Sequence, residues 1–176
     1  MANPLQLPRV VLRTPAALVA LLALSALVLQ YVLILQLTRD NVGVVLGTVR
    51  FVTYFTILSN IAVMLVACAA AAGQRGFFAQ VRVRGAVALY IGVTGSIYFF
   101  ILRHLWQPQG AQWWADTGLH YAVPLAYWAW WLACVPHGTL RWRDVARCGG
   151  MVAVPAGLCL LGVPAWRVGG RVPVSV

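Results

Sequence analysis

Four apolar runs of membrane-spanning length divide this chain. They cover residues 16–37, 51–72, 85–102 and 117–135, and a helix of about 20 apolar residues crosses the hydrocarbon core of a bilayer. Only helices and closed barrels satisfy the backbone hydrogen bonds in lipid, and these runs do not alternate as barrel strands do. The sequence therefore predicts an all-α integral membrane protein, a polytopic bundle with four transmembrane helices.

A fifth apolar run, over 148–166, is a weaker helix candidate. It contains Gly149, Gly150, Pro155 and Pro164, and glycine and proline make poor helix interiors even where lipid tolerates them. The predicted organisation is a cytoplasmic N-terminal segment over 1–14, the bundle over 15–136, a basic cytoplasmic loop over 137–147, and the weak fifth helix with an atypical tail over 148–176.

Composition argues against a soluble nucleic-acid-binding domain. Hydrophobic residues make up 62% of the chain and charged residues 9%, too few to cover a water-soluble surface. The net charge of +10 comes from arginines that lie between the apolar runs, so we expect membrane lipids rather than nucleic acid as partners.

The four cysteines lie in apolar stretches without metal-ligand spacing, at Cys68, Cys134, Cys148 and Cys159. We expect them to pack between helices, and we expect no metal or cofactor.

The arginines also predict the orientation of the bundle, because cytoplasmic connections carry an excess of basic residues. The N-terminal segment and the second and fourth connections hold the larger set, which is Arg9, Arg13, Arg75, Arg82, Arg84, Arg141, Arg143 and Arg147. The first and third connections hold only Arg39, Arg50 and Arg103. We therefore expect a multi-pass protein of the plasma membrane with a cytoplasmic N-terminus.

Two of the apolar runs carry polar residues that lipid makes costly. In the second run, Thr53, Thr56 and Asn60 are spaced by three and four, so a continuous helix would place them on one face. In the fourth run, His120 falls in the first helical turn. Both runs are predicted to cross from outside to inside, which places Thr56 about 8 Å and His120 about 5 Å from their starts. The two side chains would meet in the outer leaflet if the helices are neighbours.

A threonine beside a histidine has a chemical interpretation, because the imidazole can take the hydroxyl proton during nucleophilic attack. Asp116 lies four residues before His120 and would orient the imidazole if the helix begins early enough. Asn60 or backbone N–H groups would stabilise an oxyanion.

Other interpretations of these polar residues stay open. Threonine and asparagine also serve as polar contacts between membrane helices, and a histidine near the interface can simply reach water. A haem or metal pair of His104 with His120 is a further, less favoured interpretation.

The stretches Tyr-Phe-Thr-Ile-Leu-Ser-Asn (Tyr54–Asn60) and Leu-His-Tyr-Ala-Val-Pro (Leu119–Pro124) resemble the two signature motifs of the bacterial Pr6Pr membrane proteins. That family is similar to the eukaryotic androgen-induced and androgen-dependent TFPI-regulating proteins, multi-pass hydrolases of fatty acid esters of hydroxy fatty acids. The resemblance covers roughly Arg9 to Asp144. It implies that Thr56 is the nucleophile and His120 the base, with Thr53 as a second candidate nucleophile.

The chain departs from the family pattern in two places. Where the family shows an Asp-Trp pair after the histidine, this chain has Trp130 and Trp131, and the Tyr-Pro-Tyr-Pro-Phe stretch and sixth helix of the family are missing. Beyond Leu-Arg-Trp-Arg-Asp (Leu140–Asp144) the tail, rich in glycine, valine and proline, resembles translation in a shifted frame. We hypothesise that a frameshift or truncation replaced the last two helices; other reading frames of the gene without an apolar helix or the Tyr-Pro stretch would contradict this.

These observations favour a membrane-embedded hydrolase of lipid-like esters that uses a threonine and a histidine. The alternative is a non-enzymatic membrane protein with a structural or interaction role, which includes an inactive, truncated member of the family. A small transporter is less favoured, because the four runs contain no acid deep in the membrane.

Overall fold

The computed structural model describes residues 9–40, 42–105 and 107–136. The predictions for 1–8 and for 137–176, which include the basic loop, the weak fifth helix and the shifted-frame tail, lie outside these ranges. Helices are the only regular secondary structure in the described ranges, which contain no strand. The prediction of an all-helical fold is thereby confirmed for this part of the chain.

The helices form four long rods and one short arm. The first rod is α1 (Arg9–Thr38), the arm is α2 (Gly43–Thr53), and the second rod is α3 (Phe55–Ala71), which a short turn, η1 (Phe77–Ala79), follows. The third rod joins α4 (Val81–Ile97), the π-helical turn η2 (Tyr98–Leu102) and α5 (Arg103–Leu105). The fourth joins α6 (Ala111–Thr117), the π-helical turn η3 (Gly118–Ala122) and α7 (Val123–Cys134).

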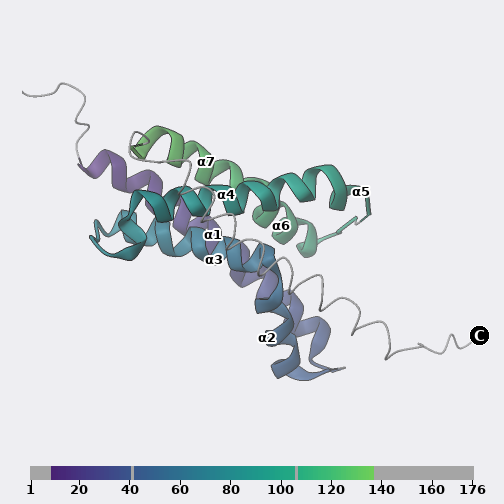
Figure 1. Ribbon diagram of the computed structural model, residues 1–176. Coiled ribbons are helices and arrows are strands. Elements are labelled where there is room, and N and C mark those ends of the chain that lie inside the picture. Colours follow the sequence, from purple (N-terminus) through teal and green to yellow (C-terminus); the bar gives the residue numbers. More distant parts are fainter. Residues whose placement is uncertain (1–8, 41, 106, 137–176) are drawn as a thin grey trace, which may run out of the picture.

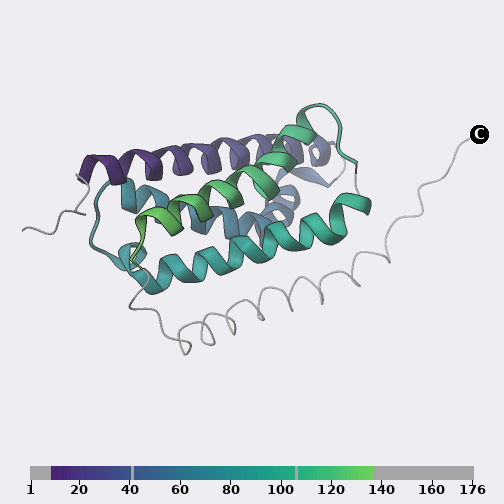
Figure 2. The same cartoon turned by 90° about the horizontal axis from the view of Figure 1, so that it is seen from above.

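The four rods run up and down and close into a bundle. Helix α1 packs against α3, α3 against α4, α4 against α7, and α7 against α1. Figure 2 shows α1, α7 and α4 lying side by side. Helix α2 pairs with the last turns of α1, and the two extend together beyond the bundle (Figure 1). Consecutive rods are neighbours, as short connections favour.

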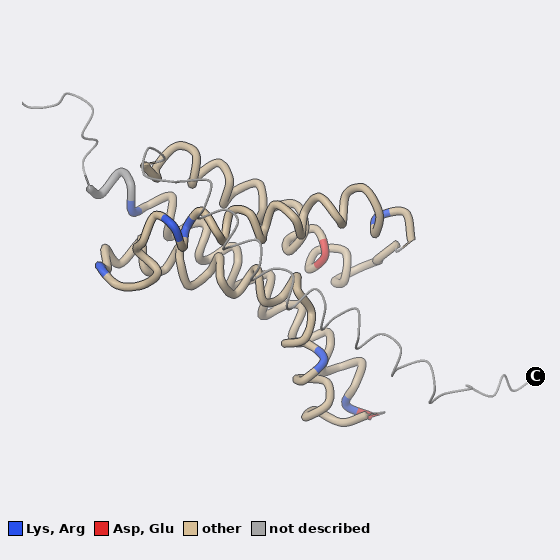
Figure 3. Tube along the Cα trace, in the orientation of Figure 1, with Lys and Arg blue, Asp and Glu red and all other residues tan. Residues whose placement is uncertain are grey.

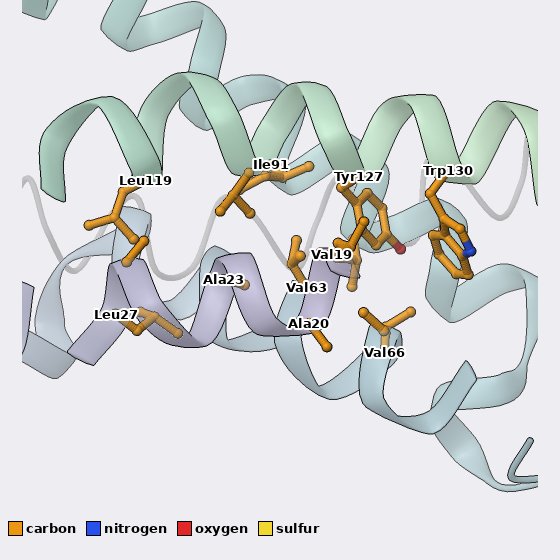
Figure 4. Packing of buried hydrophobic residues seen from close by; sticks show 14 of the residues in the cluster. Val19, Ala20, Ala23, Leu27, Val63, Val66, Ile91, Leu119, Tyr127 and Trp130 are labelled. Atoms are coloured by element: carbon orange, nitrogen blue, oxygen red, sulfur yellow. The ribbon is translucent and has the colours of Figure 1, made fainter. Parts of the chain in front are cut away.

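Helix α1 brings small side chains to the interior of the bundle, where larger side chains of the other rods pack against them, and large aliphatic side chains lie on the outside. Helix α1 buries an alanine-rich face and exposes Leu18, Leu21 and Leu24. Val19, Ala20, Ala23 and Leu27 of this face belong to one core cluster with residues of the other rods, which are Val63 and Val66 of α3, Ile91 of α4, and Tyr127 and Trp130 of α7 (Figure 4). Small residues let helices approach closely where no hydrophobic force drives them together, and an aliphatic exterior fits a lipid surrounding.

Fewer helices meet the requirements of a membrane span than the sequence predicted. Within the described ranges, Arg13–Thr38 and Val81–Leu105 are long and apolar enough, and the pair α2–α3 makes a third if its two helices, bent by 74°, form one span. The fourth predicted span is helical over 111–134 but is not among them. Tryptophans, tyrosines, Asp116 and His120 take the place of aliphatic residues in this rod.

The observed helices differ from the predicted apolar runs in three places. Helix α1 begins at Arg9 rather than at 16, so the predicted N-terminal segment is partly helical. The second run is not one helix, because Tyr54 is extended (φ −71°, ψ 125°) and separates α2 from α3. The fourth rod begins at Ala111 rather than at 117, which puts His120 in mid-helix instead of in the first turn. The last two corrections bear directly on the predicted site.

Candidate active site

Three irregularities of the helices lie at the predicted site. Thr56 is the second residue of α3, directly after the break at Tyr54. His120 lies in the middle of η3, and Tyr98 is the first residue of η2. Both η2 and η3 are π-helical turns, which are rare and occur often at functional sites. Because η3 contacts both α3 and α4, the backbone brings these positions together from three rods.

The hydroxyl of Thr56 lies within hydrogen-bonding distance of His120. The distance from Thr56 Oγ1 to His120 Nε2 is 3.3 Å. Only 11% of the His120 side chain is exposed, and Thr56 is half-buried. The sequence predicted that the two side chains would meet if their helices are neighbours, and α3 and η3 are in contact.

Asp116 holds the other nitrogen of the same imidazole. His120 Nδ1 lies 3.0 Å from the backbone oxygen of Asp116 and 3.3 Å from its carboxylate Oδ1. Both oxygens are acceptors, so we assign the imidazole proton to Nδ1. The lone pair of Nε2 then faces the hydroxyl of Thr56. A hydroxyl, an imidazole and a carboxylate therefore lie in the same order as the catalytic groups of serine-type acyl-transfer enzymes.

Tyr98 is a member of this cluster that the sequence did not indicate. Its hydroxyl donates to Asp116 Oδ2, and its ring stacks on the imidazole of His120 with centroids 4.1 Å apart and planes 21° apart. Tyr98 stands in the run Tyr-Phe-Phe-Ile-Leu of η2, where nothing in the sequence separates it from its aromatic neighbours. Only its position on the inward face of α4 and η2 identifies it.

The structure gives Asn60 a different role from the predicted one. Its Nδ2 donates to the backbone oxygens of Thr56 at 2.8 Å, within α3, and of Leu119 at 3.2 Å, in η3. Both amide protons are therefore engaged and are not free for an oxyanion. Asn60 is fully buried, and its Oδ1 has no hydrogen-bond partner among the described residues.

The backbone at the start of α3 offers the second predicted kind of oxyanion donor. Ile57 and Leu58 both donate to the carbonyl of Tyr54, and no side chain caps this helix end. The amides of Phe55 and Thr56 precede these two donors. The first N–H groups of a helix lack intrahelical acceptors and carry a partial positive charge.

Thr53 is separated from the cluster by the helix break. It is exposed at the end of α2, where its hydroxyl donates to the backbone oxygen of Arg50 at 2.8 Å. The 74° bend between α2 and α3 removes the continuous helix on which the predicted common face depended. The prediction that Thr53, Thr56 and Asn60 share one face is therefore wrong for Thr53.

The alternative pairing of His104 with His120 finds no support in the geometry. His104 is exposed on α5 and lies 3.2 Å from the Nε of Arg103, whereas His120 is held by Thr56 and Asp116. The part of the chain that the structure describes contains no group of three or more His, Cys, Asp or Glu side chains that could hold a metal ion.

A second polar contact lies one turn deeper between α3 and α4. Ser59 Oγ and Thr94 Oγ1 are 2.9 Å apart and buried. Ser59 also donates to the backbone oxygen of Thr56 at 3.0 Å. This pair links the two helices below the Thr56–His120 contact and fixes the height of α3 against α4.

Comparison with protein-family models, characterised proteins and solved structures found no match to this chain. The resemblance to the Pr6Pr family is neither supported nor contradicted by these comparisons. A functional assignment therefore depends on the geometry of the cluster and on the two motifs.

Proposed function

We propose that this chain is a membrane-embedded hydrolase of lipid-like esters, with Thr56 as the nucleophile and His120 as the base. One observation carries the proposal, namely the sequence of contacts from Thr56 Oγ1 through the imidazole of His120 to Asp116. The resemblance to Pr6Pr proteins assigns the same two residues the same roles. The chain would then be a bacterial relative of the eukaryotic Thr–His hydrolases.

The geometry supports a two-step acyl transfer. In the first step, Thr56 Oγ1 attacks the ester carbonyl while His120 Nε2 takes the hydroxyl proton. When the C–O bond breaks, the same nitrogen returns this proton to the leaving alkoxide, and an acyl-threonine remains. In the second step, water gives its proton to Nε2 and attacks the acyl group. Breakdown of this intermediate frees the acid and returns the proton to Thr56.

The backbone amides at the start of α3 are the proposed oxyanion donors. Phe55 and Thr56 lie at the positive end of the helix dipole, next to the attacking oxygen. The bend at Tyr54 supports this role, because a continuous helix would use these amides for its own hydrogen bonds. Asn60, with both donors directed at backbone oxygens, is a supporting residue that positions α3 against η3.

We also propose that the fourth rod completes a bundle of four spans. It is roughly 36 Å long at 1.5 Å per residue, enough to cross the hydrocarbon core. It packs along α1 and α4, and the two rods that contain these helices are long and apolar enough to cross a membrane. Its exposed side chains include Leu125, Trp128 and Leu132, which suit contact with lipid. A lipid-like ester would reach Thr56 laterally from the bilayer.

The arginines favour a cytoplasmic N-terminus in the plasma membrane. In Figure 3 the basic positions lie toward the ends of the helices. Arg13, Arg75, Arg82 and Arg84 belong to the end where α1 starts and α3 joins α4, and the opposite end carries Arg39, Arg50 and Arg103. With the larger set inside, Thr56 and His120 lie in the outer half of the membrane.

Topology reporters test this orientation. A reporter inserted at Gly76, between α3 and α4, should show a cytoplasmic location, and one inserted at Gly110, before α6, should show an outside location. Both glycines are exposed in connections between helices, and nothing lies within 4 Å of a Cβ atom at either position, so both insertion points are at the surface. The reverse pattern would contradict the orientation, and the same side for both sites would contradict a crossing between them.

The enzymatic role is tested by labelling the purified protein in detergent with a fluorophosphonate probe, beside an assay of lipid-ester hydrolysis. We expect hydrolysis, and we expect the covalent adduct on the peptide that carries Thr56. The Thr53→Ala variant is the matched control and should label as the wild type does, because Thr53 lies across the bend. Folded wild-type protein that neither labels nor hydrolyses any lipid ester would contradict the proposal. An adduct on Thr53 would identify Thr53, rather than Thr56, as the nucleophile.

A non-enzymatic role is the second candidate, and the interhelical hydrogen bonds favour it. The Ser59–Thr94 and Asn60–Leu119 contacts join rods within the bundle, as polar contacts between membrane helices do. Under this reading the Thr56–His120 contact would be one more such contact, in a structural protein or an inactive relative. Co-purification of a stoichiometric protein partner, with no hydrolysis, would support it.

A further inference from the structure

A buried tyrosine makes two different contacts with the cluster. Tyr98 is 5% exposed. Its hydroxyl donates to Asp116 Oδ2, and its ring stacks on the imidazole of His120. It therefore touches both partners of the contact that sets the orientation of the imidazole.

We propose that Tyr98 is a positioning residue that fixes the tautomer and rotation of His120. The proposal rests on the proposed function for its kinetic consequences, but the tautomer itself is a property of the resting protein. Tyr98 does not touch the attacking hydroxyl and takes part in no proton transfer.

The first step of the argument concerns the carboxylate of Asp116. Its Oδ1 lies 3.3 Å from His120 Nδ1, and its Oδ2 accepts from Tyr98. Because the carboxylate is nine-tenths buried, an oxygen without a donor would cost free energy. The tyrosine hydroxyl satisfies Oδ2 and leaves Oδ1 directed at the imidazole. The carboxylate then has one favourable rotation.

The second step concerns the imidazole ring. Tyr98 covers one face of His120, with the two planes 21° apart. The stack holds the plane of the imidazole ring in one orientation, in which Nε2 lies against Thr56 and Nδ1 lies against Asp116. Rotation of the imidazole out of this plane would break the stack and both hydrogen bonds together.

The third step is the close approach that makes the stack possible. A Cβ atom at Gly95, one turn before Tyr98, would lie 3.3 Å from the backbone oxygen of His120 and 3.4 Å from Pro124 Cβ. The missing side chain at this position lets η3 approach α4 closely. The ring of Tyr98 in the next turn then reaches the imidazole face. Tyr121 packs edge-on against the same ring, with centroids 5.3 Å apart.

The test uses Tyr98→Phe, which keeps the stacked ring and removes the hydroxyl, and Tyr121→Phe as the matched control. The first readout is the ¹⁵N spectrum of labelled histidine. The chain has three histidines, and a His120→Gln sample identifies the signals of His120. We expect the wild type and Tyr121→Phe to show the proton of His120 on Nδ1. In Tyr98→Phe we expect a mixture of tautomers.

The second readout is hydrolysis. Tyr98→Phe should lower kcat by about 10-fold while KM changes by less than about twofold, because a positioning residue acts on the transition state rather than on binding. The loss should also be non-additive with that of Asp116→Asn, since both changes disturb one contact.

Three results would overturn the proposal. One is an unchanged His120 tautomer in Tyr98→Phe, whatever happens to the rate. Another is a loss of kcat that adds in full to that of Asp116→Asn, and the third is a Nδ1 without its proton in the wild type. Absence of hydrolysis in the wild type would instead defeat the proposed function, and the tautomer result would still decide the role of Tyr98.

Discussion

Replacing His120 with glutamine should lower the rate of ester hydrolysis by about 10⁴-fold, the upper range for loss of a general base. The glutamine side chain can still hydrogen-bond to Thr56, but it cannot take the hydroxyl proton at neutral pH. Thr56 would then attack as an un-ionised alcohol, which is a weak nucleophile. We expect the loss in kcat and in kcat/KM alike, because the proton transfer occurs only in the transition state. The measurement is steady-state hydrolysis of a lipid ester in mixed micelles.

His104→Gln is the matched control for this change. His104 is exposed on α5 and contacts Arg103, so its replacement should leave both kinetic constants near wild-type values. A His120→Gln variant with more than about a tenth of the wild-type rate would exclude His120 as the base, since general-base catalysis contributes at least about 100-fold.

Replacing Asp116 with asparagine should lower kcat by about 10³- to 10⁴-fold, although the side chain keeps its shape. An asparagine can turn its N–H toward His120 Nδ1, which then becomes the acceptor. The imidazole proton moves to Nε2, and the nitrogen that faces Thr56 loses the lone pair that it needs. A change of this kind in serine proteases causes a loss of similar size. The variant should bind substrate with a KM near that of the wild type.

Asp40→Asn serves as the control for Asp116→Asn. Asp40 is highly exposed and pairs with Arg39 at 4.0 Å, a surface contact of little energetic weight. The Asp40→Asn variant should hydrolyse lipid esters at the wild-type rate. Full activity in Asp116→Asn would show that Asp116 does not set the tautomer of His120. In that case the backbone oxygen of Asp116, 3.0 Å from Nδ1, would be sufficient.

The helical fold is largely predictable from the sequence, because long apolar runs leave few alternatives to helices in lipid. What the sequence does not show is where these helices bend or change their pitch. The break at Tyr54 has no proline or glycine beside it, since its neighbours are Thr53 and Phe55. The early start of the fourth rod follows Gly110, whose φ of 57° turns the chain into α6, but a run of aliphatic residues begins only later. Hydropathy therefore missed the first turns of this rod.

The site was predictable in part, for reasons that differ from residue to residue. Thr56 and His120 are polar groups in apolar runs, so their cost in lipid marks them. Asp116 depended on where the helix begins, which apolarity alone could not give. The role of Asn60 depended on which backbone oxygens lie within its reach, Thr56 and Leu119. Tyr98 is chemically unremarkable in sequence and matters only through its neighbours.

The π-helical turn at Gly118–Ala122 makes the site sensitive to the length of the chain as well as to its residues. Such a turn is an α-helix that has gained one residue in a hydrogen-bonded ring. Losing one codon between His120 and Val123 would restore ordinary α-helix and rotate α6 and His120 by about 100° relative to α7. The hydropathy, the charge and every residue of the Thr56–His120–Asp116 set would stay the same. Relatives without the proposed chemistry would then be recognised by a one-residue gap in an alignment, between a histidine and a proline that are both still present.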